Sequence, residues 1–202
     1  MSIKNQDKIY FSENLDNIFK TKGLLKVNDL NNLLKEKGFL IFILILSAIP
    51  ALPIPTGGIT HVFEIIVMVL SIEIILGINK IWLPKKLLNK NLPKNLHNSK
   101  FLKNFIKIVR FFEKYSKPRF KRIVSNKVFL KFSALLILIL TISAFLAPPF
   151  SGMDTLPSLA ILLIVLGLIF EDLLISFIGV LTGSIGLGLI ITFGKFVFNL
   201  FS

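Results

Sequence analysis

Glu64 and His61 are the side chains whose types and spacing are best suited to proton chemistry. They stand three residues apart in an apolar stretch, so a helix would place them on one face. An ionisable group inside the hydrocarbon of a bilayer costs at least about 2.5 kcal/mol and is therefore usually functional. If the proline-rich break before them lies within the membrane, Glu64 is a buried proton or cation site. If that break lies at the surface, Glu64 simply sits near the interface.

Asp154 is the acid nearest a second break in the chain, and two interpretations of it stay open. It is a candidate for binding a substrate or an ion. It also precedes Thr155 and Pro157, and an acid followed by a proline in the first turn is typical of a helix start. Glu73 is a third acid within an apolar stretch, where it either faces the cytoplasmic end or pairs across helices.

Backbone N–H groups beside the two breaks are suited to an anion, because helix N-termini attract negative charge. The candidates are Thr56, Gly57, Gly58, Ser151 and Gly152. Arg119 is a further candidate, since a guanidinium binds a phosphate or a carboxylate through two hydrogen bonds. The alternative role for Arg119 is to bind lipid headgroups.

Several kinds of chemistry have no support in this sequence. The chain has no cysteine, which excludes disulfides and thiolate ligands, and it has only two histidines. It shows no Ser/His/Asp set, no metal-ligand spacing and no phosphate-binding glycine loop. The glycines from Gly183 to Gly188 lie in an apolar segment and have the wrong order for a nucleotide site. We therefore expect neither an enzyme nor a bound cofactor or metal.

The elements that position these residues are apolar blocks of the kind that a bilayer imposes. The chain is 53% hydrophobic, and nearly all of its Lys and Arg residues lie outside the blocks. The blocks cover residues 39–50, 59–78, 128–145, 156–170 and 173–193. We predict an all-α integral membrane protein with a cytoplasmic N-terminal amphipathic segment (1–37) and one membrane domain (38–202).

The membrane domain divides into two helical hairpins, at 39–79 and 128–171, and a final transmembrane helix at 173–200. Each hairpin is broken at its turn by proline and glycine, which cannot continue a helix. Residues 39–50 would form only about 18 Å of helix against a hydrocarbon core of about 30 Å. The first hairpin is therefore predicted to be re-entrant, while the second stays ambiguous because residues 128–145 are long enough to cross. The side of the C-terminus stays open.

A shift of 94 positions superposes the two hairpins and indicates an internal repeat. It matches Lys37 with Lys131, Pro55 with Pro149, and Gly58 with Gly152, among other pairs. Paired broken segments in two halves are the sequence pattern of a transporter-like site near the bilayer midplane. The alternative is that both breaks are ordinary turns at the outer face of the membrane.

The segment between the hairpins, 80–127, carries the positive charge of the chain. It holds fifteen Lys and Arg residues against Glu113 alone, in a chain of net charge +13. A basic loop between apolar spans indicates a cytoplasmic location beside anionic lipid headgroups, and it is not taken as a nucleic-acid surface. Within it, an apolar stripe predicts an amphipathic helix in the plane of the membrane. The stripe consists of Phe101, Phe105, Ile108, Phe112 and Tyr115.

Four sequence motifs together resemble the ExoD family of bacterial exopolysaccharide-synthesis membrane proteins. They are the run 47–55 (SAIPALPIP), Trp82-Leu83-Pro84, Lys117-Pro118-Arg119-Phe120, and the run from Leu156 through Gly167 to Glu171-Asp172. The resemblance covers about residues 39–191. Where the family commonly has glycine after the acidic pair, this chain has Leu173, which puts a hinge there in doubt.

The resemblance implies a multi-pass protein of the bacterial inner membrane that serves exopolysaccharide production, without specifying a reaction. One hypothesis is a carrier that moves an anionic or lipid-linked precursor at a polar site between the hairpins, with proton coupling through Glu64. The alternative is a non-transporting accessory or scaffold protein of the assembly machinery. Gly179 and Gly183 are four residues apart, which predicts a helix-packing face and a possible contact for a homo-oligomer.

Overall fold

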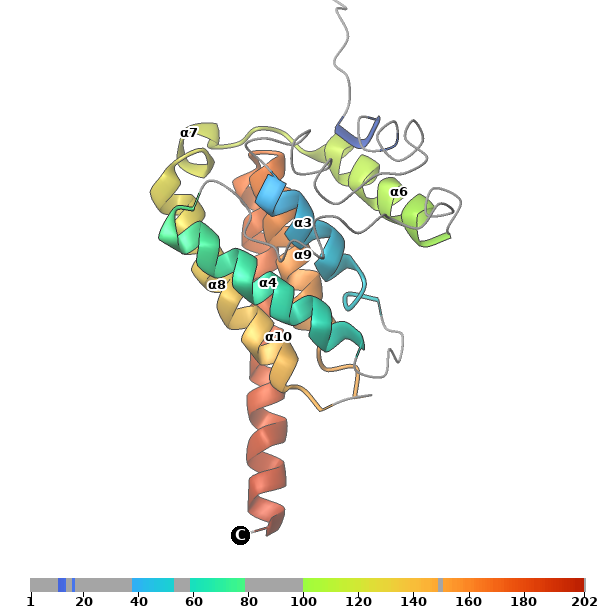
Figure 1. Cartoon of the computed structure of the whole chain (residues 1–202), viewed down its shortest axis with the longest axis vertical. Coiled ribbons are helices and arrows are strands. Elements are labelled where there is room, and N and C mark those ends of the chain that lie inside the picture. Colours follow the sequence, from blue (N-terminus) through green and yellow to red (C-terminus); the bar gives the residue numbers. More distant parts are fainter. Residues whose placement is uncertain are drawn as a thin grey trace, which may run out of the picture. The chain divides into compact units, whose positions relative to one another are not determined.

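The computed structural model describes residues 11–13, 16, 38–52, 59–78, 100–148 and 151–201 (Figure 1). Every regular element in these ranges is an α-helix, so the all-α prediction is confirmed for the described part of the chain. The chain separates into two compact units, residues 1–33 with 83–116 and residues 34–82 with 117–202. The predicted division into an N-terminal segment and a single membrane domain stays a prediction.

The smaller unit contains α6 (Lys100–Tyr115). Its buried face consists of Leu102, Phe105, Ile106 and Val109, which follow helical spacing. Glu113 accepts hydrogen bonds from the backbone N–H groups of Phe11 and Ser12 and so attaches residues 11–12 to the helix. Two residues of the predicted apolar stripe, Ile108 and Tyr115, are exposed. The placement of α6 in the plane of a membrane stays a prediction.

The larger unit is built around α9 (Thr155–Ile169). Every residue from Pro157 to Ile169 except Leu159 is buried, as expected of a helix that is apolar on all sides. Three helices pack on it: α3 (Gly38–Ala48), α8 (Lys127–Leu146) and α10 (Leu173–Phe201). The remaining long helix, α4 (Ile59–Leu76), packs on α8 and α3, and the short α7 (Lys121–Val124) precedes α8 (Figure 1).

Glycines of α10 bring it close to α9, as the sequence predicts for Gly179 and Gly183. A Cβ atom added to Gly179 would lie 2.8 Å from the backbone nitrogen of Ile164, and one added to Gly183 would lie 2.7 Å from Leu140 of α8. No larger side chain fits at either position without displacing a neighbour. This face is occupied within the chain, so an oligomer through Gly179 and Gly183 would require α9 to leave it, and the oligomer stays a prediction.

The helices α4 and α9 end in the same hydrogen-bond pattern. At the end of α4, the N–H of Gly77 bonds to Ile74 O (3.0 Å) and the N–H of Ile78 bonds to Glu73 O (2.9 Å). At the end of α9, the corresponding donors are Glu171 and Asp172, which bond to Leu168 O (3.4 Å) and Gly167 O (2.8 Å). Gly77 and Glu171 both have positive φ, +76° and +58°. Each helix therefore ends in a Schellman motif.

Two helices of the described residues are long and apolar enough to cross a membrane, α8 and the segment Leu173–Asn199 of α10. Most of their surface is not covered by other parts of the chain, and the C-terminal half of α10 extends beyond α8 and α9 (Figure 1). The helices α3 and α9 are apolar but shorter, with 11 and 15 residues. These features are compatible with a membrane protein. The crossing of α4 and the re-entrant form of the first hairpin stay predictions.

Candidate functional site

Glu64 is a buried acid whose carboxylate has one engaged oxygen and one without a partner. Its side chain is 3% exposed, and its Oε2 lies 2.8 Å from Nδ1 of His61, one turn earlier on α4. Its Oε1 makes no hydrogen bond to any described residue. The His61 ring packs against Phe145 of α8, with 5.1 Å between centroids, which fixes the start of α4 against the end of α8. A buried polar atom without a partner is costly, so this oxygen makes Glu64 a candidate for binding a proton, an ion or a water molecule.

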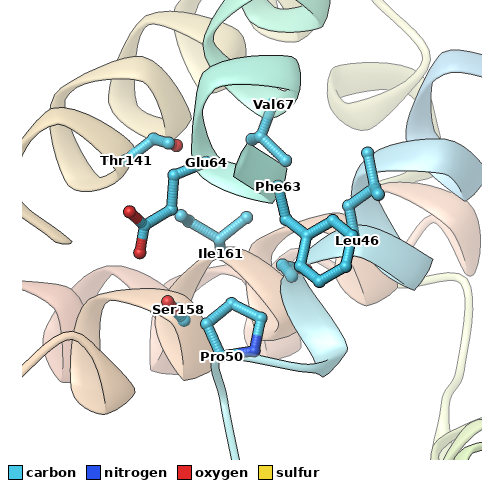
Figure 2. Close-up of a pocket in the computed structure, with 9 residues that line it drawn as sticks. Leu46, Pro50, Phe63, Glu64, Val67, Thr141, Ser158 and Ile161 are labelled. Atoms are coloured by element: carbon cyan, nitrogen blue, oxygen red, sulfur yellow. The ribbon is translucent and has the colours of Figure 1, made fainter. Parts of the chain in front are cut away.

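A small cavity lies beside the Glu64 carboxylate, between the two hairpins. Its volume is about 10 Å³, which is room for about one water molecule. Figure 2 shows the carboxylate between Thr141 of α8 and Ser158 of α9. The cavity is lined by Leu46, Ser47, Pro50, Phe63, Glu64, Val67, Thr141, Ser158 and Ile161. Both hairpins therefore contribute residues to one site.

Two hydroxyl groups at the cavity already donate their protons to the backbone. Ser47 Oγ donates to Leu44 O (3.2 Å), and Thr141 Oγ1 donates to Ile137 O (2.7 Å). A hydroxyl has one proton and two lone pairs, so each of these oxygens still has acceptor capacity. Such oxygens accept hydrogen bonds from a water molecule or from a protonated carboxyl group.

The charges around the cavity are unfavourable for an anion. Asp154 is close enough for its charge to act on Glu64, so two acids share this end of the bundle. Lys131 of α8 lies at the opposite end of α4, where its Nζ would be 3.6 Å from a Cβ atom on Gly77. That ammonium group lies beside the C-terminus of α4, where the helix dipole favours a positive charge. It does not compensate the charge at the cavity.

The predicted site residues are only partly brought together. Glu64 and His61 are in contact, and Asp154 acts on Glu64 through its charge. Asp154 occupies the N-cap position of α9, but its side chain makes no capping hydrogen bond. Ser151 and Gly152 form an exposed turn before α9, in which Ser151 Oγ accepts a hydrogen bond from the N–H of Met153 (3.2 Å). Thr56, Gly57 and Gly58 lie outside the described residues.

Arg119, the predicted anion ligand, is bonded to an acid of the chain itself. Its Nη1 lies 3.2 Å from Oδ2 of Asp172, whose side chain is fully buried. Asp172 also accepts hydrogen bonds from the N–H groups of Lys117 (3.0 Å) and Leu174 (3.1 Å). Three donors thus satisfy this buried carboxylate. Binding of an external anion by Arg119, whose side chain is 40% exposed, stays a prediction.

Three residues of the cavity, Ser47, Thr141 and Ser158, are not among the site residues predicted from the sequence. A single Ser or Thr in an apolar helix is common and is not by itself a signal. The signal was available in the 94-residue shift, which pairs Ser47 with Thr141, Glu64 with Ser158, and Val67 with Ile161. Among the described residues, no three His, Cys, Asp or Glu side chains are grouped so that they could hold a metal ion.

Comparison with known proteins gives one family and one relative. Residues 11–192 match the family described as "Exopolysaccharide synthesis, ExoD". The chain is 28% identical over 147 residues to slr1875 of Synechocystis sp., which is named only as an uncharacterized protein. That alignment covers 73% of this chain and 68% of the relative. No solved structure matches.

Proposed function

The chain belongs to the ExoD family of exopolysaccharide synthesis, and from this premise we propose that it is a membrane carrier whose two hairpins enclose one polar site. The cargo is an anionic or lipid-linked precursor of the polysaccharide, and its negative charge would bind outside the cavity, because Glu64 and Asp154 disfavour an anion there. The observation that carries the proposal is the cavity between the hairpins, into which a buried acid with an unpartnered oxygen projects. An acid in such a place inside a membrane bundle is typical of a transport or proton pathway.

The packing of the helices supports an internal repeat that relates the two hairpins. The 94-residue shift matches α3 with part of α8, and α4 with α9. When the two hairpins are exchanged, the packed pair of α3 and α9 therefore becomes the pair of α8 and α4, which is also packed. The Schellman motifs at Gly77 and Glu171 are also 94 positions apart. Transporters with related halves bind their substrates at the interface of the repeats, which is where this cavity lies.

The size of the cavity constrains how such a carrier would operate. A volume of about 10 Å³ does not admit a sugar or a phosphate group, so the described arrangement corresponds to a closed state. Movement of one hairpin against the other would open the site. The breaks between α3 and α4 and between α8 and α9 are the places where this movement would be absorbed, because the described residues there, 49–52, 147–148 and 151–154, are not helical.

The location proposed for this carrier is the bacterial inner membrane, with several crossings. The basic segment between the hairpins would lie on the cytoplasmic side beside anionic headgroups. On α6, basic side chains are exposed, which supports this orientation. They are Lys100, Lys103, Lys107, Arg110 and Lys114.

A second function, an accessory protein of the assembly machinery, is favoured by a different observation. Ile108, Phe111 and Tyr115 form an exposed apolar stripe on α6, with side chains that are 38%, 58% and 60% exposed. Basic and aromatic side chains together suit the surface of a partner or a membrane. In this alternative the hairpins only hold the protein in the bilayer, and the cavity stays closed.

Reconstitution into liposomes separates the two functions. The purified protein is incorporated into vesicles that contain labelled undecaprenyl-linked sugars, and the transfer of label between the leaflets is measured. A carrier transfers the label, and Glu64→Gln abolishes most of the transfer. Glu73→Gln is the matched control, because Glu73 is also a buried acid of α4 but does not line the cavity. No transfer by the wild-type protein would contradict the carrier.

A further inference from the structure

We propose that the cavity is the binding site of a single proton, carried by Glu64, with Ser158 as the acceptor at the equivalent position of the second hairpin. The inference rests on the proposed carrier and names its coupling ion. It starts from three features of the site: the unpartnered oxygen of Glu64, the contact with His61, and the pairing of cavity residues by the internal repeat.

The charge of the site selects a positive ligand. Glu64 and Asp154 are the acids that act at this end of the bundle. Of the helices that line the cavity beside α4, α3 has no titratable side chain, and α9 has none after Asp154. The basic residues of α8, Lys127 and Lys131, lie at its opposite end. His61 and Glu73 are the other titratable residues of α4.

The chemistry of the lining selects a proton over a metal cation. Five of the nine lining residues are apolar, and the cavity has room for about one water molecule. Hard divalent cations take six or more oxygen ligands, which this lining does not offer. His61 adds a nitrogen 2.8 Å from the carboxylate, and chains of Glu and His are typical of proton relays in membrane transporters.

The repeat accounts for the number of protons. The 94-residue shift pairs two hydroxyl residues, Ser47 and Thr141, and two β-branched residues, Val67 and Ile161. At the remaining pair the halves differ, since one carries Glu64 and the other Ser158. The site therefore has one carboxylate and a hydroxyl opposite to it, which corresponds to one proton and one acceptor.

The proton path follows from these contacts. In the protonated state, Glu64 donates through Oε1 to the oxygen of Ser158 or Thr141, directly or through one water molecule. For release, the carboxyl group of Glu64 rotates so that its O–H points away from the hydroxyl groups and at Nδ1 of His61, which is neutral with its proton on Nε2. The O–H bond of Glu64 then breaks and the proton binds to Nδ1, which gives a carboxylate and an imidazolium ion. The imidazolium then loses the proton on Nε2 to water, because the His61 side chain is 27% exposed whereas Glu64 is 3% exposed.

Infrared difference spectroscopy in nanodiscs tests the protonation without any substrate. Spectra of the purified protein are recorded over the pH range in which it stays folded. We expect a band of a buried carboxylic acid that belongs to Glu64 and disappears on deprotonation. The band should be absent in Glu64→Gln and present in Glu73→Gln, and its titration should be the same in sodium and choline salts. A titration that sodium displaces would overturn the proton assignment, and so would a band that Glu64→Gln retains.

An exchange of the two equivalent residues tests the pairing. Glu64→Ser should lose the acid band, and the double variant Glu64→Ser with Ser158→Glu should regain it, because the repeat gives both positions access to the same cavity. Thermal unfolding of each variant establishes that the protein is folded. A folded double variant without the band would contradict the pairing. Label transfer with no titration of Glu64 would overturn this inference and leave the carrier standing, whereas titration without transfer would overturn the carrier.

Discussion

Arg119 and Asp172 form an ion pair in which the guanidinium nitrogen lies 3.2 Å from a carboxylate that is fully buried. Both belong to the motifs on which the family resemblance rests, Lys117-Pro118-Arg119-Phe120 and Glu171-Asp172. Arg119 and Asp172 are 53 positions apart in the sequence, yet their side chains are hydrogen-bonded. The pair joins the segment before α7 to the turn between α9 and α10. Arg119 thus has a structural role within the chain.

Asp172→Asn should destabilise the protein by about 1–3 kcal/mol, because it removes a charge that three donors stabilise and leaves a buried amide with an unsuited N–H group. The measurement is thermal unfolding in detergent. The control is Lys121→Met, which removes the neighbouring and more exposed pair between Lys121 and Glu171 (3.1 Å). That pair should contribute less than about 1 kcal/mol. Equal losses in both variants would contradict the special role of Asp172.

Gly77→Ala should destabilise the protein by about 1 kcal/mol, since Gly77 has a φ of +76° that alanine adopts only with strain. The added Cβ atom itself has room, with its nearest neighbour at 3.6 Å, so the effect would come from the backbone. Gly188→Ala is the matched control in α10, where a Cβ atom meets nothing within 4 Å and the helix should gain stability. A stabilising Gly77→Ala would show that α4 does not end in a Schellman motif.

Gly179→Ala should destabilise the packing of α10 on α9 by about 1–3 kcal/mol. The added Cβ atom would lie 2.8 Å from the backbone nitrogen of Ile164 and 2.9 Å from the backbone oxygen of Ala160, and neither can move as a side chain can. Unfolding of the purified variant measures the loss. Gly194→Ala, in the part of α10 where nothing lies within 4 Å, serves as the control. A neutral Gly179→Ala would mean that the two helices are further apart.

Single cysteines in this cysteine-free chain should reveal how deep the two breaks lie. We expect a cysteine at Leu52 to be protected from membrane-impermeant reagents, because the 11 residues of α3 are too few to cross the bilayer. A cysteine at Ser151 should react, since that turn is exposed and follows α8, which is long enough to cross. Equal reactivity at both positions would remove the argument for a re-entrant first hairpin.

The sequence was sufficient to predict the helical class and most helix positions. Apolar blocks and proline-rich breaks led to α8, α9 and α10 within a few residues of their bounds, because both signals are local. The packing of Gly179 and Gly183 was also predicted from their spacing and is confirmed.

Contacts between distant segments were the part that the sequence did not reveal. The pair Arg119 and Asp172 depends on how α7 and α9 are brought together, and Arg119 looked like a ligand for an external anion. On α6, packing buries Leu102 and Val109, which the predicted apolar stripe did not include. At the cavity, Glu64 and His61 were recognised from their charge, whereas Thr141 and Ser158 were not, since a hydroxyl in an apolar helix gives no local signal.

Proton-driven transfer of lipid-linked sugar in liposomes tests whether Glu64 couples transport to a proton. Vesicles that contain the wild-type protein or Glu64→Gln are given a pH gradient, and the transfer of labelled lipid-linked sugar is compared with transfer in vesicles at equal pH. We expect the gradient to accelerate transfer by the wild-type protein, and we expect reversal of the gradient to reverse the preferred direction. Glu64→Gln should abolish both effects, and Glu73→Gln should retain them. Transfer that is independent of the gradient, or a gradient effect that survives Glu64→Gln, would contradict this coupling.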